Sequence, residues 1–505
     1  MSETLDARVA ELAARYRPLA ARILAEAIRI PADHVHDDPS CGLSNHEGPR
    51  VEYLKRTLVE IGAVRSADDV FFDDFGNLVW VLEDPDDGVA REDKKVVFFD
   101  GHTDTVKALR SQWLDKIGGG IDAYDGLVDA ERVDRAFLMR ELGWLPAEHE
   151  WEHLLFGRGA ADQLGGVVAQ VVASKILLEL APLGALRGVV VRSYGTVCEE
   201  DNDGCGPMFV TRKVLRESPE WIPDAVVLTE GTGDSAKGAL GIYRGQRGRM
   251  QIEVVVTGRS CHGSMPWEGL NPLEYGAAIL VEAAAAYRAG DGFLDHAFLG
   301  AGSRTASWAQ LDTPSDCAVP DRFTFRFDRR LTAGEDPADA VAAIDGLPAV
   351  AVAREAGLSV EVGVPVYDQA SWKGYVLGNE QIYMGWETPE DHPAIHAAVD
   401  TYRGVVSPHV SPGGEGGQLR HDPRVDRWIF STDGVGFPLP VEGSGVDVPV
   451  SKRWVRVGDY HHPPMFGVGP GIEQNTHKIG EAVDLRELQH AIAMLARFPS
   501  RLAGE

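Results

Sequence analysis

Cysteine is scarce in this chain, and its spacing is irregular. Among 505 residues there are five cysteines, an odd number with no CxxC pair, namely Cys41, Cys198, Cys205, Cys261 and Cys317. Disulfide scaffolds need a dense, even set of cysteines, and thiolate zinc sites need closely spaced pairs. The sequence therefore argues against both a disulfide framework and a cysteine-ligated zinc site.

Positive charge is also in short supply. The chain has 49 lysines and arginines against 77 aspartates and glutamates, which gives a formal net charge of −28. Proteins that follow a phosphate backbone carry the opposite balance, so we expect no nucleic-acid partner. The acidity has two explanations that composition leaves open: a well-solvated surface, or an acidic pocket that binds metal cations.

Long apolar runs are few as well. We expect no stretch to approach the roughly 20 apolar residues of a membrane span, and the first 30 residues carry acids where a signal peptide would carry basic and then apolar residues. These features predict a cytosolic protein without membrane association. The hydrophobic share of 44% is normal for a globular chain, and the length suggests two to four domains of roughly 150 residues.

The chain does contain an alternation of buried strands and helices. After a helical segment at 5–30, short β-branched runs at 94–100, 188–194 and 225–228 alternate with an apolar helix at 165–180. This order is typical of βαβ units. We predict an α/β fold with a mixed, mostly parallel sheet and helices on both faces, whose ligands gather at the carboxyl ends of the strands.

The pattern changes after residue 241. Strand-like runs at 250–256, 322–327 and 359–362 alternate more strongly between apolar and polar residues, and a helix is expected at 271–286. A tract rich in proline and glycine at 375–393 has the composition of a return linker. The predicted organisation is a larger α/β domain in two parts, 1–241 and 387–505, interrupted by a smaller α+β domain at 242–386.

Histidine and carboxylate side chains follow two of the predicted strands. His102 and Asp104 come after the first buried run, and Glu199 and Glu200 follow the run at 188–194. Residues two apart on an extended segment point the same way, so Asp104 could orient one ring nitrogen of His102 while the other binds a metal. Adjacent residues alternate in direction, so either Glu199 or Glu200 could bind a metal while the other acts as a base.

Three further candidates complete the set. Glu230 follows the run at 225–228, Asp162 lies in GRGAADQLGG before a helix, and His477 lies in GVGPGIEQNTHK. Each alone has an ordinary structural explanation, such as a helix N-cap for Asp162. Together, two histidines and three carboxylates near successive strand ends suit zinc or a similar ion. One shared carboxylate would hold two ions about 3.5–4 Å apart.

The motifs that carry these residues resemble those of a known family. In order they are FFDGHTDTV, LLFGRGAADQLGG, YGTVCEED, VVLTEG and GVGPGIEQNTHK. The series is similar to the dizinc amidohydrolase and peptidase family that includes acetylornithine deacetylase, succinyl-diaminopimelate desuccinylase, aminoacylase and carboxypeptidase G. The resemblance extends over almost the whole chain from about residue 94. Within the family, the chain looks closest to the selenium-metabolism-linked hydrolases.

The resemblance implies how two zinc ions would be held. His102, Asp162 and Glu230 would bind one ion, and Asp162, Glu200 and His477 the other, so Asp162 is the bridge. Cobalt or manganese would also suit these ligands, because several divalent ions accept imidazole and carboxylate donors.

The resemblance also implies a reaction. Glu199 would act as the general base, Asp104 would brace His102, and the peptide bond between Asp162 and Gln163 would be cis. The expected activity is hydrolysis of a C–N amide or peptide bond in a small substrate, an N-acyl amino acid or a dipeptide. A non-catalytic small-molecule binder on a degenerate metal scaffold is an alternative, against which the intact Glu199 argues.

The segment at about 241–386 resembles the family's dimerisation domain, which implies a homodimer. Its SCHGS motif matches that of a histidine which reaches the partner's active site, where His262 would stabilise the oxyanion. A polar loop histidine is the simpler alternative. Asn271 and Arg330 match positions that often touch substrate, and the guanidinium of Arg330 suits a carboxylate, although a surface salt bridge explains it about equally well.

Two stretches depart from the family pattern. Extra residues lie at about 107–152 and 438–459, where they could form a lid or plain surface loops. In the first of them, Asp122 and Asp125 form a DxxDG context like that of related carbamoylases. This context raises a rival bridging ligand and a carbamoyl-amide substrate as alternatives. The two histidines at 461–462 are expected to be structural rather than additional ligands.

Overall fold

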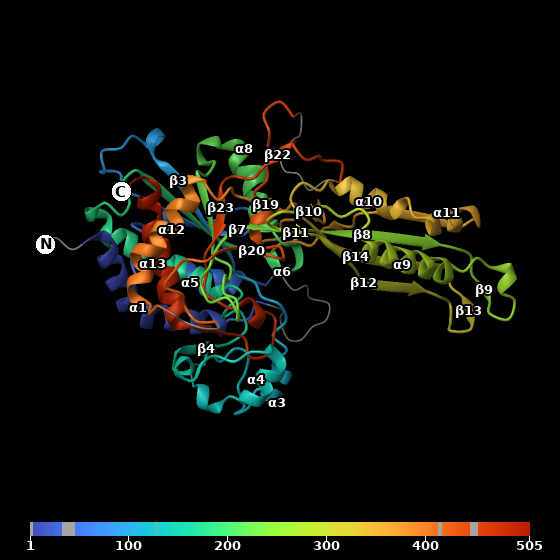
Figure 1. Cartoon of the computed structure of the whole chain (residues 1–505), viewed down its shortest axis with the longest axis horizontal. Coiled ribbons are helices and arrows are strands. Elements are labelled where there is room, and N and C mark those ends of the chain that lie inside the picture. The colour runs from blue at the N-terminus through green and yellow to red at the C-terminus, as the bar shows by residue number, and fades with distance from the viewer. Residues whose placement is uncertain (1–3, 33–45, 128, 413–416, 445–452, 505) are drawn as a thin grey trace.

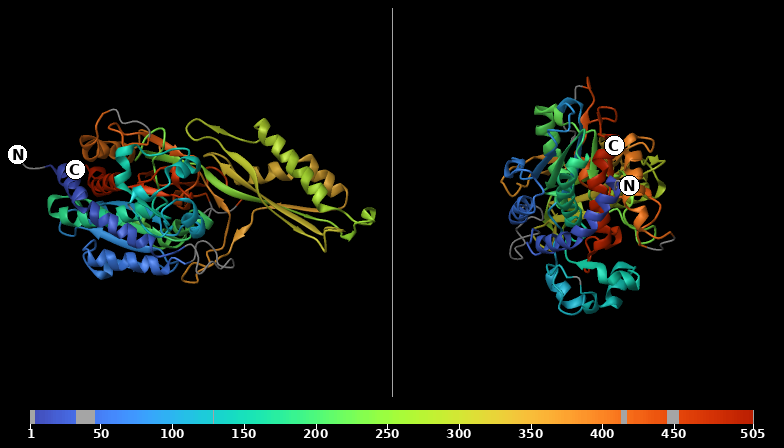
Figure 2. Two further views of the ribbon diagram at one scale, coloured as in Figure 1. Left: turned by 90° about the horizontal axis from the view of Figure 1, so that it is seen from below. Right: turned by 90° about the vertical axis from the view of Figure 1, so that its left-hand side faces the viewer.

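The computed structural model describes residues 4–32, 46–127, 129–412, 417–444 and 453–504. A wide body is built from both ends of the chain, and a long arm built from its middle projects from one side of that body (Figure 1, Figure 2).

A nine-stranded sheet forms the centre of the body. Its strands are β1 (Val70–Phe72), β2 (Leu78–Glu83), β3 (Lys95–His102), β5 (Val189–Thr196), β6 (Ala225–Leu228), β7 (Ile242–Gln246), β19 (Trp386–Glu387), β20 (Val425–Trp428) and β23 (Met465–Gly467). The order is β1-β2-β5-β3-β6-β23-β7-β19, and β20 also pairs with β7. The central strands β5, β3, β6 and β23 run parallel, while β1 and β2 on one side and β19 on the other are antiparallel to their neighbours. The predicted α/β fold with a mostly parallel central sheet is confirmed.

The central strands are apolar on both faces because helices cover the sheet on both sides. Every residue of β5 and β6 is buried, and in β3 only Lys95 is exposed. Within β3, Val97 and Phe99 face one hydrophobic cluster, and Phe98 faces another on the opposite side. This two-sided burial explains why the sequence shows continuous apolar runs here rather than alternation.

Helices from distant parts of the chain cover the two faces. One face carries α1 (Leu5–Ile28), α5 (Leu164–Leu180), α12 (Pro393–Val405) and α13 (Leu485–Leu502), with α2 (Gly48–Glu60) beside α1. The other face is covered by the π-helical turn Val210–Val214 and α8 (Leu215–Glu217), which follow α7 (Cys205–Phe209).

The α5 helix corrects one expectation from the sequence. Its window Leu164–Leu183 has a mean hydropathy of 1.6 and is long enough to span a membrane, so the statement that no stretch approaches such a span is wrong. In the structure, 83% of this window is buried inside the protein. Its apolar character therefore follows from its place in the core, between α1 and α13.

The α13 helix buries a histidine whose protonation opposes folding. Burial and the nearby cationic or imidazole side chains lower the pKa of His490 from 6.5 to about 4. The unfolded chain therefore binds this proton more tightly, so stability falls as the pH drops from about 6.5 towards 4. Between pH 6.5 and 5, the free energy of unfolding should therefore fall by about 2 kcal/mol less in His490→Gln than in the parent. Urea unfolding at several pH values measures this difference.

A suitable control for that measurement is His396→Gln. His396 is exposed on α12, so this variant should keep the parent's pH dependence. Identical pH profiles for the parent and His490→Gln would show that His490 does not contribute to acid lability.

The arm consists of a second sheet with three helices on one face. Its five strands are β8 (Gly248–Thr257), β12 (Ser303–Asp312), β14 (Arg322–Leu331), β15 (Ser359–Gly363) and β18 (Ile382–Tyr383). Helices α9 (Pro272–Ala289), α10 (Pro337–Asp345) and α11 (Pro348–Glu355) pack against it (Figure 1). Buried residues alternate with more accessible ones along β14, as the sequence pattern predicted for a sheet with one solvated face.

The chain crosses between the two sheets at neighbouring points. The body strand β7 ends at Gln246 and the arm strand β8 begins at Gly248. On return, β18 pairs with β8 and β19 pairs with β7, so the predicted linker tract contains short strands. The predicted domain limits at 241 and 386 stay a prediction.

The first extra segment forms a small unit with its own apolar cluster at one edge of the body (Figure 1). It contains α3 (Arg110–Lys116), α4 (Arg135–Leu142) and the 3₁₀ helix Glu148–His153. The second extra stretch, 438–459, includes residues 445–452, which lie outside the described ranges.

Short paired strands complete the chain. They are β4 (Leu154–Phe156) with β24 (Ala482–Asp484), β9 (Cys261–His262) with β13 (Ala318–Val319), β10 (Asp295–His296) with β11 (Gly300–Ala301), β16 (Val366–Tyr367) with β17 (Asn379–Glu380), and β21 (Leu439–Pro440) with β22 (Tyr460–His461).

Candidate active site

Three neighbouring strands bring the predicted ligands to one edge of the body sheet. His102 is the last residue of β3, Glu200 lies just beyond β5, and Glu230 lies two residues beyond β6. Because these strands are adjacent and parallel, their carboxyl ends meet at the same edge. The prediction that these side chains lie together follows from this register.

Asp162 lies at the centre of the cluster. Its Oδ1 is 3.0 Å from His102 Nε2, and its Oδ2 is 2.9 Å from His477 Nε2. The same His477 nitrogen is 3.1 Å from Glu200 Oε2. The His102 nitrogen that faces Asp162 is also 3.7 Å from Glu230 Oε2. One carboxylate thus faces two imidazole nitrogens through its two oxygens, which is the arrangement required of a bridge between two ions.

The donor set fits divalent metal ions. Donor atoms of His102, Asp162 and Glu200 lie within 4.8 Å of one another, and all three side chains are buried or nearly so. Imidazole nitrogens and carboxylate oxygens are the donors that zinc and related ions accept. The same cluster crowds several carboxylates into a space with little solvent, which a bound cation would relieve.

The pKa shifts of the cluster reflect the crowding of buried carboxylates. Burial and neighbouring carboxylates raise the pKa of Glu200 and Glu230. Although burial opposes it, hydrogen bonds from the two histidines hold the pKa of Asp162 below its usual range. Burial by itself would lower the pKa of His477, but hydrogen bonds to Asp162 and Glu200 raise it to about 12. These shifts show that the cluster favours positive charge between the Asp162 carboxylate and the two imidazoles.

Asp104 connects two sides of the cluster. Its Oδ1 lies 3.4 Å from His102 Nδ1, on the side of the ring away from Asp162. The same carboxylate accepts hydrogen bonds from the backbone N–H groups of Glu199 and Glu200, at 3.2 and 2.9 Å. Asp104 is fully buried, so it can hold both the His102 ring and the start of α6 (Glu199–Asn202) in place.

Glu199 lies beside the ligands and lines the cavity above them. Its Oε2 is 3.9 Å from His102 Nε2. Burial, only partly offset by His102, raises its pKa well above the usual value for a glutamate. A carboxylate with a raised pKa next to a cavity is suited to accept and return a proton.

The position of Asp162 depends on two residues that the sequence did not single out. Fully buried Glu481 accepts hydrogen bonds from the backbone N–H groups of Ala161 and Asp162, at 3.0 and 3.1 Å. Its other oxygen accepts a 2.5 Å bond from Arg158, whose guanidinium also donates to the carbonyl of His477. The peptide bond between Asp162 and Gln163 is cis, as predicted.

Gln163 has a second role that the sequence did not indicate. Its Nε2 donates a 2.6 Å hydrogen bond to Glu230 Oε2, and the side chain is buried. Gln163 therefore orients Glu230 from the residue next to the bridge. Its own motif carried no signal for this role, because the partner lies 67 positions further along the chain.

The ion pair between Arg158 and Glu481 should matter strongly for stability. Glu481→Gln would leave the Arg158 charge buried without its partner and weaken the support of the Asp162 backbone. We expect a loss of about 3–5 kcal/mol in the free energy of unfolding. Denaturant unfolding measures it, and Glu152→Gln, at an exposed site, is the matched control. A loss below about 1 kcal/mol would show that this buried pair contributes little.

A cavity of about 570 Å³ opens above the ligands. Arg249 and Arg330 project into its wall from the arm strands β8 and β14. Arg330 lies against Asp328, with Nε 2.8 Å from Oδ1, and its Nη1 donates to Ser431 at 3.3 Å. The predicted substrate residue Arg330 is thus placed at the cavity, where it is held by a neighbouring carboxylate.

The other two arm candidates lie elsewhere. His262 is exposed on β9 near the far end of the arm (Figure 1), and its Nδ1 accepts a hydrogen bond from the backbone N–H of Ser264. Asn271 caps α9, where its Oδ1 accepts from Leu273 N–H at 3.1 Å. Within one chain, neither residue joins the cluster.

Asp122, the rival bridging ligand, has a different environment. Arg110 binds it with a 2.6 Å hydrogen bond, and Asp125 accepts a bond from its backbone N–H. Both acids thus stabilise a turn in the first extra segment. Of the histidines at 461–462, His461 is exposed on β22, and burial lowers the pKa of His462 to about 3.

Comparisons with known proteins agree with this geometry. Residues 244–351 match the family model of a peptidase dimerisation domain. The chain is 31% identical over 500 residues to the uncharacterized protein YgeY of Escherichia coli strain K12, with 98% of each chain covered. Among solved structures, the dipeptidase Dug1p of Saccharomyces cerevisiae superposes with a TM-score of 0.62 at 12% identity and 99% coverage of both chains.

A second solved structure carries a family name. The M20 family metallo-carboxypeptidase Sso-CP2 of Sulfolobus solfataricus superposes with a TM-score of 0.60 at 15% identity, covering 96% of this chain and 99% of that one. At such identities the structural matches establish the fold, while the full-length relative and the dimerisation-domain match establish kinship. The chain therefore belongs to the M20 peptidase family, whose members are metal-dependent hydrolases of C–N bonds.

Proposed function

We propose that this protein is a homodimeric hydrolase that cleaves the C–N amide bond of a small substrate, an N-acyl amino acid or a dipeptide. The observation that supports this most strongly is the Asp162 carboxylate, which faces His102 and His477 through its two oxygens at 3.0 and 2.9 Å. The buried Glu199 beside it supplies a base for such a reaction.

Each ligand has an assigned place in the proposal. His102, Asp162 and Glu230 would hold one ion, and Asp162, Glu200 and His477 the second. We propose zinc, with cobalt or manganese as substitutes that these donors also accept. When bound, the two ions would acidify a water molecule towards neutral pH and polarise the carbonyl of the scissile amide.

The chain's own groups would carry out the proton transfers. Glu199 would take a proton on its carboxylate and return it to the leaving nitrogen, which its raised pKa favours. Asp104 would keep the His102 ring in place through its contact with Nδ1. Arg330 would bind the substrate carboxylate from the cavity wall.

The dimer would complete the site. The dimerisation-domain match lies on the arm, and exposed His262 near the arm's far end would reach the active site of the second copy to stabilise the oxyanion. Asn271, on the same arm, would contact substrate there. A cytosolic location and a place among the selenium-metabolism-linked hydrolases belong to the same proposal.

The proposed function can be tested with a substrate screen. Zinc-loaded protein, chelated protein and a Glu199→Gln variant would be incubated with N-acyl amino acids, dipeptides and carbamoyl amides, and products identified by mass spectrometry. Cleavage of an N-acyl amino acid or dipeptide that requires both metal and Glu199 supports the proposal. Cleavage of carbamoyl amides alone would favour the carbamoylase alternative. If the zinc-loaded protein cleaved none of the compounds, a binding protein would be favoured.

Metal binding should stabilise the fold independently of activity. Two ions would replace the repulsion among the buried carboxylates with attraction, so we expect two zinc equivalents per chain in calorimetric titration. At a zinc concentration a hundred to a thousand times Kd, each occupied site should contribute about 3–4 kcal/mol of stability, visible as a raised Tm. His477→Ala should bind about one equivalent. Full stoichiometry in that variant would contradict the ligand assignment.

A further inference from the structure

A second cavity of small-molecule size lies elsewhere in the body. It has a volume of about 510 Å³ and is bounded by α1, the 3₁₀ helix Ser407–His409 and α13. It shares no lining residue with the cavity above the metal ligands. This volume falls in the range of about 300–1,000 Å³ typical of small-ligand sites.

One wall of this cavity offers unsatisfied cationic or donor groups. Arg17 is partly buried and forms no ion pair or hydrogen bond with any residue in the described ranges. His490 is only 6% exposed and stacks on His409 with ring centroids 6.3 Å apart. Neither ring nitrogen of His490 has a hydrogen-bond partner among the described residues. A buried imidazole and a free guanidinium that line the same cavity suit a carboxylate.

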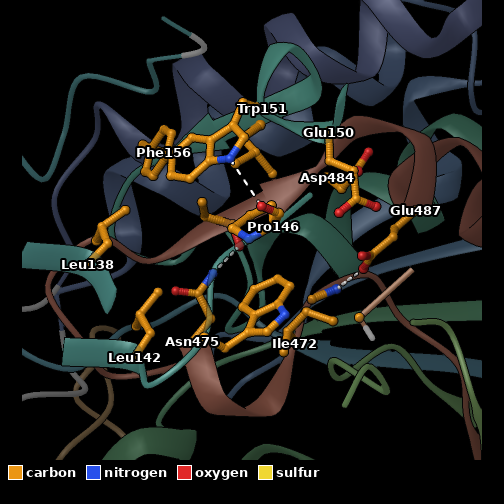
Figure 3. Close-up of a pocket in the computed structure, with 16 residues that line it drawn as sticks. Leu138, Leu142, Pro146, Glu150, Trp151, Phe156, Ile472, Asn475, Asp484 and Glu487 are labelled. Atoms are coloured by element: carbon orange, nitrogen blue, oxygen red, sulfur yellow. Dashed lines mark hydrogen bonds between the residues drawn. The ribbon is translucent and has the colours of Figure 1, made fainter. Parts of the chain in front are cut away.

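Acidic side chains line the same cavity, and Glu487 lies one helical turn before His490 on α13. Glu150, Asp484 and Glu487 lie close together there (Figure 3). Arg486 binds Asp484 at 2.5 Å and Glu150 at 3.2 Å, so these two carboxylates already have a cation. Glu487 is 5% exposed and accepts a hydrogen bond from Gly471 N–H, but within the described part of the chain it has no ion-pair partner. An ammonium group would satisfy it.

The three acids also border a narrow apolar cleft. Its walls include Leu142, Trp151 and Phe156 (Figure 3), and only about 30 Å³ of it is wide enough for a water molecule. Buried Asn475 lines this cleft with a carbonyl oxygen that has no hydrogen-bond partner in the described structure. A small apolar group at the mouth of the cleft would be shielded from water.

We propose that the second cavity is a binding site for a free α-amino acid with a small apolar side chain. Its carboxylate binds Arg17 and His490, its ammonium group binds Glu487, and its side chain faces the apolar cleft. Glu487 also holds Gly471, at the start of the segment that ends at the metal ligand His477. An occupant therefore lies on the other side of the segment that forms one wall of the active site.

Isothermal titration calorimetry on the zinc-loaded protein tests this site. The probes are L-valine, 3-methylbutanoate, which lacks the ammonium group, and isobutylamine, which lacks the carboxylate. None of them contains an amide bond, so the result does not depend on the proposed hydrolysis. L-valine should bind at least tenfold more tightly than either analogue, because each analogue lacks one of the two charged groups that the cavity would bind.

Two variants locate the binding. Arg17→Gln and Glu487→Gln should each weaken L-valine binding at least tenfold, while Arg15→Gln should not. Arg15 lies on the same helix, is largely exposed and pairs with Glu11, which makes it a matched control. Arg17 is only partly buried, so its variant keeps the test decisive even where Glu487→Gln fails to fold. Circular dichroism checks the fold of each.

Three outcomes would overturn the proposal. Equal affinity for L-valine and 3-methylbutanoate would indicate a simple carboxylate site. Unchanged L-valine binding in Arg17→Gln would place the binding at the metal centre instead. Inorganic phosphate that binds as tightly as L-valine and competes with it would show a general anion site.

Discussion

Glu199→Gln is expected to lower kcat by about 10²–10⁴-fold while the protein still binds two metal ions. Glutamine has nearly the same shape as glutamate, but it cannot accept a proton at the pH of the reaction. Glu199 is not among the five proposed ligands, and its Oε2 is 3.9 Å from His102 Nε2. The variant should therefore lose proton transfer and keep the metal centre.

The measurement combines steady-state kinetics with metal analysis of the same sample. An exposed glutamate replaced in the same way, Glu152→Gln, controls for the loss of one negative charge. If Glu199→Gln retained the parent's kcat, the base assignment would be wrong. If it lost metal together with activity, Glu199 would instead be a ligand.

His262→Ala should have the second largest effect, a loss of about 10²–10³-fold in kcat. The side chain is exposed on β9, away from the metal ligands of its own chain. Such a loss from so remote a position would support the proposal that the histidine acts in the active site of a second copy. The free energy of unfolding should change by less than about 0.5 kcal/mol, because the site is at the surface.

Mixed dimers separate this explanation from a local one. His262→Ala chains keep Glu199, and Glu199→Gln chains keep His262. In a symmetric dimer, each mixed pair regains one complete site. An equal mixture of the two inactive variants should therefore recover about a quarter of the parent's activity. Absence of any recovery after subunit exchange would count against a shared site.

Much of the body could be predicted from the sequence because its strands are buried on both faces. Runs such as 225–228 match β6 residue for residue, and the run at 94–100 marks β3 within two residues at its end. Continuous apolar runs bounded by charges leave few alternatives to a central parallel strand. The same burial gives helix α5 the hydropathy of a membrane span, which the expectation of no such stretch overlooked.

The proximity of the five proposed ligands could be predicted because each stands in a distinctive motif near the end of a strand or in a glycine-rich loop. The residues that support them could not. Glu481 and Arg158 are 323 positions apart, and nothing in the sequence around either one marks a buried ion pair. Such partners are chosen by the packing of two loops, and local propensity carries no information about that packing.

The sequence by itself determined the fold class and the donor types near the strand ends, because these depend on residue identity and on periodicities that repeat within a few positions, and its motifs carried the resemblance that implies the kind of chemistry. Only the tertiary structure decided which carboxylate lies between the two histidines, which backbone groups hold it, and that Asp122 belongs to a turn bound by Arg110. These outcomes depend on distances of a few ångströms between segments far apart in the chain, and those distances exist only once the sheet and its loops have packed.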